Sequence, residues 1–572
     1  MTTLDGATVE VIRNYLVSAA EEMRRTLVRA AFNPVIYDVL DFGISMYDAD
    51  RQLMAEAPGI TSFLGANDHA IHRLVDYVGV ENLHAGDVLM LNYPYWNSAH
   101  AYDAMLLAPV FRDGVDRPAA YLAVRAHWLD LGAKAPGYVL DATDMHQEGL
   151  IFPGTKVVKA GEVDRELLEL IRFNSRVPDL VIGDFYAQLA AIRAGERRLR
   201  QVWEKFGPET VEQAVRQIIA HGERVARRAV AALPDGVYTA HDWLDDDGIT
   251  EDPVRMAVRV TIDGDQMTVD YNDSDPAVAG PMNMPLGATE SMAKTVFKAL
   301  TTPNEPANAG HYRPLRVVAD PGNLFHAVYP AATFTLWTQI VAFELIHKAL
   351  RDAVPGIPAS TGGDEPGFMA LGTDPRTGRY FVVSNNEGIG WGATRTSDGA
   401  NALQHPSTSV VRNTPIEVLE HKSTVFHERL ELICDSGGAG RYRGGLGVLR
   451  QAVFTADGEL LSMKKKTTTR PWALDGGGEP EPNRMVVFPG TDAERSVRMR
   501  RVAMRAGDRF VNTSAGGGGC GNPLDRDPAA VIADVRDGYV SAEAAERVYG
   551  LVVHPDGTAT PTPARIARAE AR

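Results

Sequence analysis

The stretch that decides the fold is residues 92–130, which read NYPYWNSAHAYDAMLLAPVFRDGVDRPAAYLAVRAHWLD. Two apolar runs, residues 104–111 and 119–126, flank the polar segment 112–117 with its Asp-Gly step at Asp113. Apolar runs of this length around an Asp-Gly turn are typical of a β-hairpin. We therefore predict two antiparallel strands that fold back on each other.

The same hairpin predicts a cluster of polar side chains at its open end. A turn centred near Val115 places Asp103 opposite His127, with their Cβ atoms about 4.5–5.5 Å apart. His100 precedes Asp103 by three residues. A single His or Asp at a strand end is more often a cap or a surface group. Two imidazoles and a carboxylate that converge make a candidate divalent-metal site.

Composition sets the outer limits of function. The chain has 572 residues, a formal net charge of −16 and two cysteines, Cys434 and Cys520. This charge argues against nucleic-acid or anionic-membrane partners, and two cysteines cannot form a disulfide framework or a cysteine metal cluster. The sequence has no apolar signal core and no run of about 18 apolar residues. A cytoplasmic protein is the expectation.

The length predicts several domains, and the pattern predicts an α+β fold built from hairpin-based mixed sheets, helical segments and a β-rich C-terminal region. The turn at residues 233–236 and the rise in Gly, Asn, Ser and Thr after residue 361 suggest the boundaries. We predict an α+β domain at 1–235 that carries the metal site, a central α+β domain at 236–360, and a Gly-rich, β-dominated domain at 361–572.

Apolar periodicity predicts the individual elements. Helices are expected at 9–31, 66–77, 163–233 (broken at Pro178 and near Pro208), 288–300 and 336–353. A strand is expected at 41–48, and a second hairpin joins 256–262 to 267–271. Residues 131–154 show little periodicity and are expected to form a long loop beside the candidate site, with the carboxylates of Asp141, Asp144 and Glu148 more often solvated than functional.

Two glycine-rich segments, 437–447 and 516–521, do not contain a nucleotide-binding motif. A P-loop needs Gly, four residues and then Gly-Lys-Ser/Thr, which neither segment has. These glycines are expected to serve tight turns and close backbone packing. An ATP-dependent activity would therefore need a partner chain to bind the nucleotide.

Several motifs in order give the chain a resemblance to the hydantoinase B/oxoprolinase family. The segments that carry it are 41–45 (DFGIS), 92–95 (NYPY) with 100–103 (HAYD), 125–132 (RAHWLDLG), 148–153 (EGLIFP), 437–445 (GGAGRYRGG) and 516–523 (GGGGCGNP). The resemblance extends over nearly the whole chain. Many members have Asn-Asp-Pro-Tyr and Gly-Gly-Thr-His where this chain has NYPY and, at 97–100, NSAH. Those residues are expected to line the approach to the site.

The resemblance implies one subunit of a two-gene enzyme. It implies that Asp41, His100, Asp103 and His127 hold one divalent metal, Mn or Zn in preference to Mg because two ligands are imidazoles. His127 and Asp130 are the candidate catalytic residues, with Asp130 expected to orient an imidazole. The partner would be a hydantoinase A-like subunit that binds ATP and Mg, so the assembly would be a hetero-oligomer.

The sequence leaves three functions open. The first is ATP-dependent opening of a cyclic amide, such as a hydantoin, 5-oxoproline or a lactam. The second is ATP-dependent carboxylation of a ketone of the acetone or acetophenone type. The third is a non-catalytic scaffold with a structural metal, which a closed four-ligand site would favour.

Overall fold

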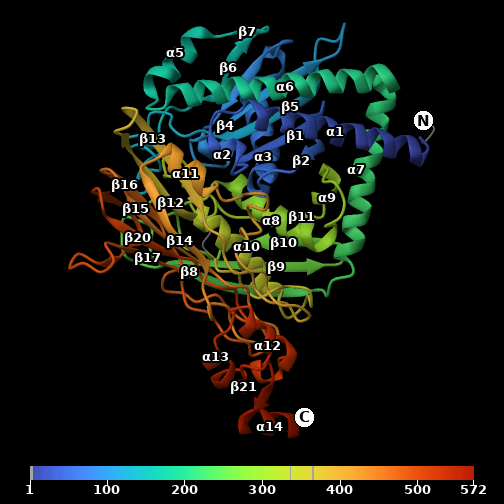
Figure 1. Ribbon diagram of the computed structural model, residues 1–572. Coiled ribbons are helices and arrows are strands. Elements are labelled where there is room, and N and C mark those ends of the chain that lie inside the picture. Colours follow the sequence, from blue (N-terminus) through green and yellow to red (C-terminus); the bar gives the residue numbers. More distant parts are fainter. Residues whose placement is uncertain (1–3, 335, 364–365, 572) are drawn as a thin grey trace.

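The computed structural model describes residues 4–334, 336–363 and 366–571. It contains several antiparallel sheets covered by helices, with a small C-terminal unit projecting from the body (Figure 1). This arrangement confirms the predicted α+β class with a β-rich C-terminal region. The proposed division at residues 235 and 360 stays a prediction.

A seven-stranded sheet forms the first part, in the order β2-β1-β5-β4-β3-β6-β7. Its strands are β1 (Phe42–Asp48), β2 (Leu53–Ala57), β3 (Val88–Leu91), β4 (Asp103–Phe111), β5 (Pro118–His127), β6 (Pro153–Lys159) and β7 (Glu162–Val163). The predicted hairpin is confirmed as β4 and β5, and Asp103 pairs with His127 as expected. The predicted strand at 41–48 is β1, which pairs with β5.

The two faces of this sheet are covered by different helices because side chains alternate along each strand. Ile44 and Leu106 join one core with α1 (Gly6–Ala30) and α6 (Pro178–Phe206). Tyr47 and Met105 face the other side, where α3 (Thr61–Val78) packs. The helix predicted at 66–77 thus begins five residues earlier, at Thr61.

The segment 163–233 is helical and is interrupted where its prolines predicted. It forms α5 (Arg165–Asn174), α6 and α7 (Pro208–Val230), and a proline occupies the first turn of both α6 and α7. Proline is tolerated there because the N–H it lacks has no partner within the helix. Short helices elsewhere in the first part are α2 (Pro34–Tyr37), α4 (Pro94–Asn97), η1 (Val80–Asn82) and η2 (Met145–Glu148).

The middle of the chain is a four-stranded sheet with two long helices. Its order is β11-β10-β9-β8, from β8 (Gly236–Leu244), β9 (Val254–Asp263), β10 (Gln266–Asp270) and β11 (Leu315–Val318). The predicted hairpin is confirmed as β9 and β10. The predicted helices are α8 (Leu286–Thr301) and α10 (Leu336–Leu350), which contact each other, and a short α9 (Ala309–Tyr312) follows α8.

Two further sheets share an apolar core in the last part of the body. One runs β13-β12-β16-β19, from β12 (Pro366–Asp374), β13 (Arg379–Asn386), β16 (Gly458–Met463) and β19 (Met499–Met504). The other runs β14-β15-β20-β17-β18, from β14 (Val425–Leu432), β15 (Val448–Phe454), β17 (Arg484–Val487), β18 (Arg495–Ser496) and β20 (Arg509–Thr513). A helix, α11 (Ile416–Lys422), lies between β13 and β14 in the chain.

The projecting unit has a small core of its own. It follows η3 (Pro523–Asp525) and contains α12 (Pro528–Arg536), α13 (Ala542–Arg547), β21 (Leu551–Val553), β22 (Ala559–Pro561) and α14 (Pro563–Glu570) (Figure 1). The described residues contain no helix that is both long and apolar enough to span a membrane.

The two glycine-rich segments pack against each other, backbone on backbone. The N–H of Gly438 donates to the carbonyl of Gly517, and the N–H of Gly517 donates to the carbonyl of Gly445. A Cβ added at Gly444 would come 1.9 Å from the carbonyl oxygen of Gly517. Only glycine allows this approach, which confirms that these glycines serve close packing.

Candidate metal centre

Three side chains converge at the open end of the β4–β5 hairpin. His127 Nδ1 lies 2.9 Å from Asp103 Oδ1, and His100 Nε2 lies 3.4 Å from Asp103 Oδ2. One ligand atom from each residue lies within 4.8 Å of the others. The hairpin prediction therefore brought the correct three residues together.

Asp41 stands beside this cluster, immediately before β1. Its carbonyl accepts the backbone N–H of His127, so the ends of β1 and β5 are held together here. Its carboxyl oxygen Oδ1 is buried and has no hydrogen-bond partner. Asp41 lines the same small cavity, of about 50 Å³, as His100 and Asp103. The structure thus places all four expected ligands in one neighbourhood.

The loop that carries His100 is held by buried hydrogen bonds. The side chain of Asn92 donates to the carbonyls of Ala101 and Leu150, and it accepts the backbone N–H of Phe152. Asn97 donates to the carbonyl of Asp103. Ser98 and Ala99 line the cavity, as expected for residues on the approach to the site.

Burial and mutual charge set the protonation of the four groups. Burial lowers the pKa of His100 to about 4, so its ring is neutral at pH 7. Burial raises the pKa of Asp41 to about 7, opposed by the charge of His127 and reinforced by that of Asp103. For Asp103, the charges of both imidazoles outweigh burial and lower its pKa. Burial disfavours the charged form of His127, but its hydrogen bond with Asp103 and the two carboxylates raise its pKa overall.

Other parts of the chain supply the remaining wall of the cavity. Tyr138 places its hydroxyl 3.3 Å from His127 Nε2. Gln339 on α10, Asn386 at the end of β13, and Thr408 also line the cavity. Sequence reasoning missed these residues because none lies in a local motif and three of them are more than 200 residues from the hairpin.

A buried cation, also missed, lies one alternation away from His127 on β5. Arg125 is fully buried, and its guanidinium lies 5.3 Å from the centre of the Phe63 ring. Gly43 pairs with Arg125 across the strands, and a Cβ at Gly43 would come 2.8 Å from Phe63 Cβ. Burial lowers the pKa of Arg125 to about 10, which leaves it charged at pH 7. Its charge partly compensates the carboxylates above it. A charged residue inside an otherwise apolar strand was the signal that could have found it.

Asp130 lies apart from the imidazoles, which corrects the expectation that it orients one. Its carboxylate accepts the backbone N–H groups of Gly132 and Arg176 and the guanidinium of Arg176 at 2.9 Å. Both nitrogens of His127 are occupied by Asp103 and Tyr138 instead. Asp130 therefore fixes the start of the 131–154 loop against the segment before α6.

The loop carboxylates behave mostly as expected of solvated groups. Asp141 is exposed, and Asp144 caps η2. Glu148 is the exception, because it is 2% exposed and accepts the backbone N–H of Thr333. Burial raises its pKa to about 8.

Comparison with known proteins identifies the class of this chain. The model of the hydantoinase B/oxoprolinase family matches residues 5–523, so the chain belongs to that family. Members include proteins named as hydantoinase, 5-oxoprolinase and caprolactamase components.

Individual relatives resemble the chain over almost its full length. It is 31% identical to a putative D-/L-hydantoinase component of Pseudomonas sp. (strain NS671), over 96% of this chain and 95% of the relative. It is 29% identical to the beta component of the caprolactamase of Pseudomonas jessenii, over 97% and 98% of the two chains. A crystal structure of ATP-dependent caprolactamase from Pseudomonas jessenii superposes with a TM-score of 0.91 at 26% identity and covers 100% of both chains.

Proposed function

We propose that this chain is the metal-binding subunit of a two-component, ATP-dependent enzyme that opens a cyclic amide such as a hydantoin, 5-oxoproline or a lactam. The observation that carries the proposal is the cluster of His100, Asp103 and His127 with Asp41 beside it, within a chain of the hydantoinase B/oxoprolinase family. The caprolactamase relative, whose name makes it one subunit of an ATP-dependent enzyme, supports the cyclic amide class.

The donor atoms fit a divalent cation. Oδ1 of Asp41 and Nδ1 of His100 are buried without a hydrogen-bond partner, and such groups are costly unless something satisfies them. Two imidazoles with two carboxylates suit Zn or Mn better than Mg. When bound, such an ion would polarise a carbonyl oxygen or lower the pKa of a bound water.

The chain's own residues prepare the site for that role. The neutral ring of His100 can bind a cation without first losing a proton. Asp103 lies against both rings and fixes their orientation through its two oxygens. The cavity is walled by Phe63, Tyr138 and Leu336, which restricts water around the reacting groups.

Nucleotide binding is assigned to a partner. This chain has no P-loop, and its glycine-rich segments are consumed by packing against each other. Amide resonance makes direct attack on a cyclic amide difficult, so a partner that phosphorylates the carbonyl oxygen would supply the driving force. We expect a hydantoinase A-like subunit that binds ATP and Mg.

Coexpression with a hydantoinase A-like subunit tests the proposal. ATP turnover of the complex should depend on a hydantoin, 5-oxoproline or a lactam, and should not depend on bicarbonate. Turnover that requires both a ketone and bicarbonate would replace the proposal with a ketone carboxylase. Turnover that survives loss of metal in a His100→Ala/His127→Ala variant would instead favour a scaffold.

A further inference from the structure

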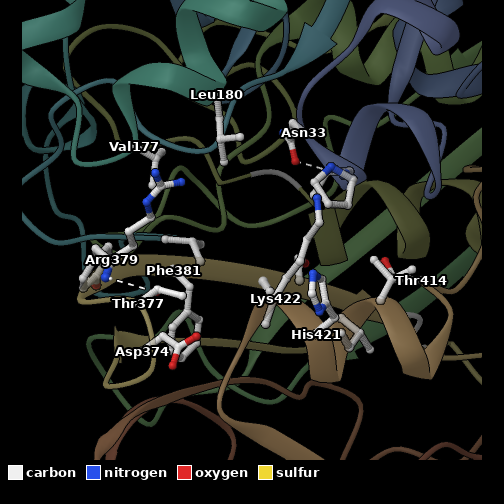
Figure 2. A pocket seen from close by; sticks show the side chains of 18 residues that line it. Asn33, Val177, Leu180, Asp374, Thr377, Arg379, Phe381, Thr414, His421 and Lys422 are labelled. Carbon is white, nitrogen blue, oxygen red and sulfur yellow. Dashed lines mark hydrogen bonds between the residues drawn. The ribbon is translucent and has the colours of Figure 1, made fainter.

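A second cavity, apart from the metal centre, lies where the first part of the chain meets the C-terminal sheets. Its volume is about 280 Å³. It is bounded by residues before and within α2, by the start of α6, by the β12–β13 hairpin and by α11. Figure 2 shows Arg379 on one side of this cavity and Lys422 with His421 on the other.

Most of the cavity wall is apolar. Its apolar side chains come from all the bounding elements and include Val35, Val177, Leu180, Phe381, Val383 and Val418. Ligand sites are typically apolar hollows of about 300–1,000 Å³ with a few polar groups that set orientation. This cavity is near the lower end of that range, so it suits a molecule smaller than a typical drug.

The charged groups of the cavity are predominantly positive. The Nζ of Lys422 is 2.6 Å from the Tyr37 hydroxyl, and no described carboxylate forms an ion pair with it. Arg379 likewise has no ion-pair partner among the described residues. The one acidic residue in the lining, Asp374, is already chelated by the guanidinium of Arg376.

A buried carboxyl near Lys422 is a poor counterion for it. Asp184 is 1% exposed, and its Oδ1 accepts the backbone N–H groups of Phe32 and Asn33. Burial raises the pKa of Asp184 to about 7, so it is only partly ionised at neutral pH. The positive charge in the cavity is therefore available to a ligand.

We propose that this cavity binds a small carboxylic acid with an apolar body, whose carboxylate pairs with Lys422 while its hydrocarbon part lies against Leu180 and Phe381. Charge complementarity selects the carboxylate, and the apolar wall selects the body. The proposal concerns a site distinct from the metal centre and does not depend on the proposed reaction.

Asn33 connects this cavity to the metal centre. It lines the cavity, its side-chain oxygen caps α2 through the N–H of Val35, and its side-chain N–H donates to the carbonyl of His127 at 3.1 Å. A ligand that shifts Asn33 would therefore act on the strand end that carries a proposed metal ligand. We expect occupancy of the cavity and metal affinity to be coupled.

Calorimetric titration of the full chain with hexanoate, and with 1-hexanol as the uncharged counterpart, tests the site. Hexanoate should bind more tightly than hexanol, and Lys422→Met should weaken hexanoate binding at least about tenfold because a charge-assisted contact is lost. Lys422→Arg should restore much of it. Lys159→Met removes an exposed lysine that does not line the cavity, and should have no effect.

A second variant keeps the test independent of Lys422. Leu180→Trp fills the cavity and should abolish binding of both compounds, with thermal melting used to confirm that it folds. Equal binding of hexanoate and hexanol, unchanged hexanoate binding in Lys422→Met or in Leu180→Trp, or no binding to the wild type would each overturn the proposal. Metal affinity that is identical with and without saturating hexanoate would overturn the coupling.

Discussion

Replacing Asp103 with Asn tests the metal centre most directly. The substitution keeps the shape of a side chain that is 1% exposed, and it removes the charge that lies against both imidazoles. Loss of a group that merely orients a metal ligand typically lowers metal affinity about 10–100-fold. Loss of a charged ligand should cost at least about 100-fold, equivalent to about 2.7 kcal/mol.

The fold should tolerate this change. The hydrogen bond between His127 and residue 103 becomes a neutral one, which lowers the free energy of unfolding of the metal-free protein by about 1 kcal/mol. No apolar side chain changes its burial. The strand pairing of β4 with β5 uses backbone groups, so the hairpin should remain intact.

The assay compares wild type, Asp103→Asn and Asp141→Asn side by side. Asp141 is exposed in the neighbouring loop and serves as the matched control. Metal content, thermal melting and partner-dependent ATP turnover are measured for each protein. Asp103→Asn should lose metal and most turnover while melting within a few degrees of wild type. Wild-type metal content together with wild-type turnover in this variant would refute the assignment of the site.

The metal, the nucleotide and a buried carboxyl each give a further prediction. The purified chain should contain about one equivalent of Zn or Mn, and elemental analysis of His100→Ala/His127→Ala should show its loss; full retention would place the metal elsewhere. The isolated chain should show no ATP binding by calorimetry, and tight binding would contradict the assignment of the nucleotide to a partner. Glu148 has a pKa of about 8 when folded, above its ordinary value of 4.5, so the stability it contributes is complete below about pH 4.5 and is lost as the pH rises through 8. Glu148→Gln should therefore melt at the same temperature as wild type at pH 5 and several degrees higher at pH 9, whereas an equal difference at both pH values would refute the raised pKa.

The comparison of sequence with structure separates local from long-range information. The length of the turn at 112–117 and the alternation on either side sufficed to pair Asp103 with His127, because register within a hairpin is set by its connection. The prolines at 178 and 208 marked helix starts for a similarly local reason. The position of Asp41 next to His127 came from the family resemblance, since its strand pairing spans more than 80 residues.

Other features were decided only by the tertiary structure. Asp130 was expected beside an imidazole, yet it pairs with Arg176, a residue 46 positions later that no motif connects to it. Tyr138 and Gln339 reach the metal centre because the loop 131–154 and α10 pack over the open end of the hairpin. Hydrophobic patterning specifies which face of an element is buried but not which distant element covers it. The sequence alone therefore determined the metal-binding hairpin, and tertiary packing determined the walls of both cavities.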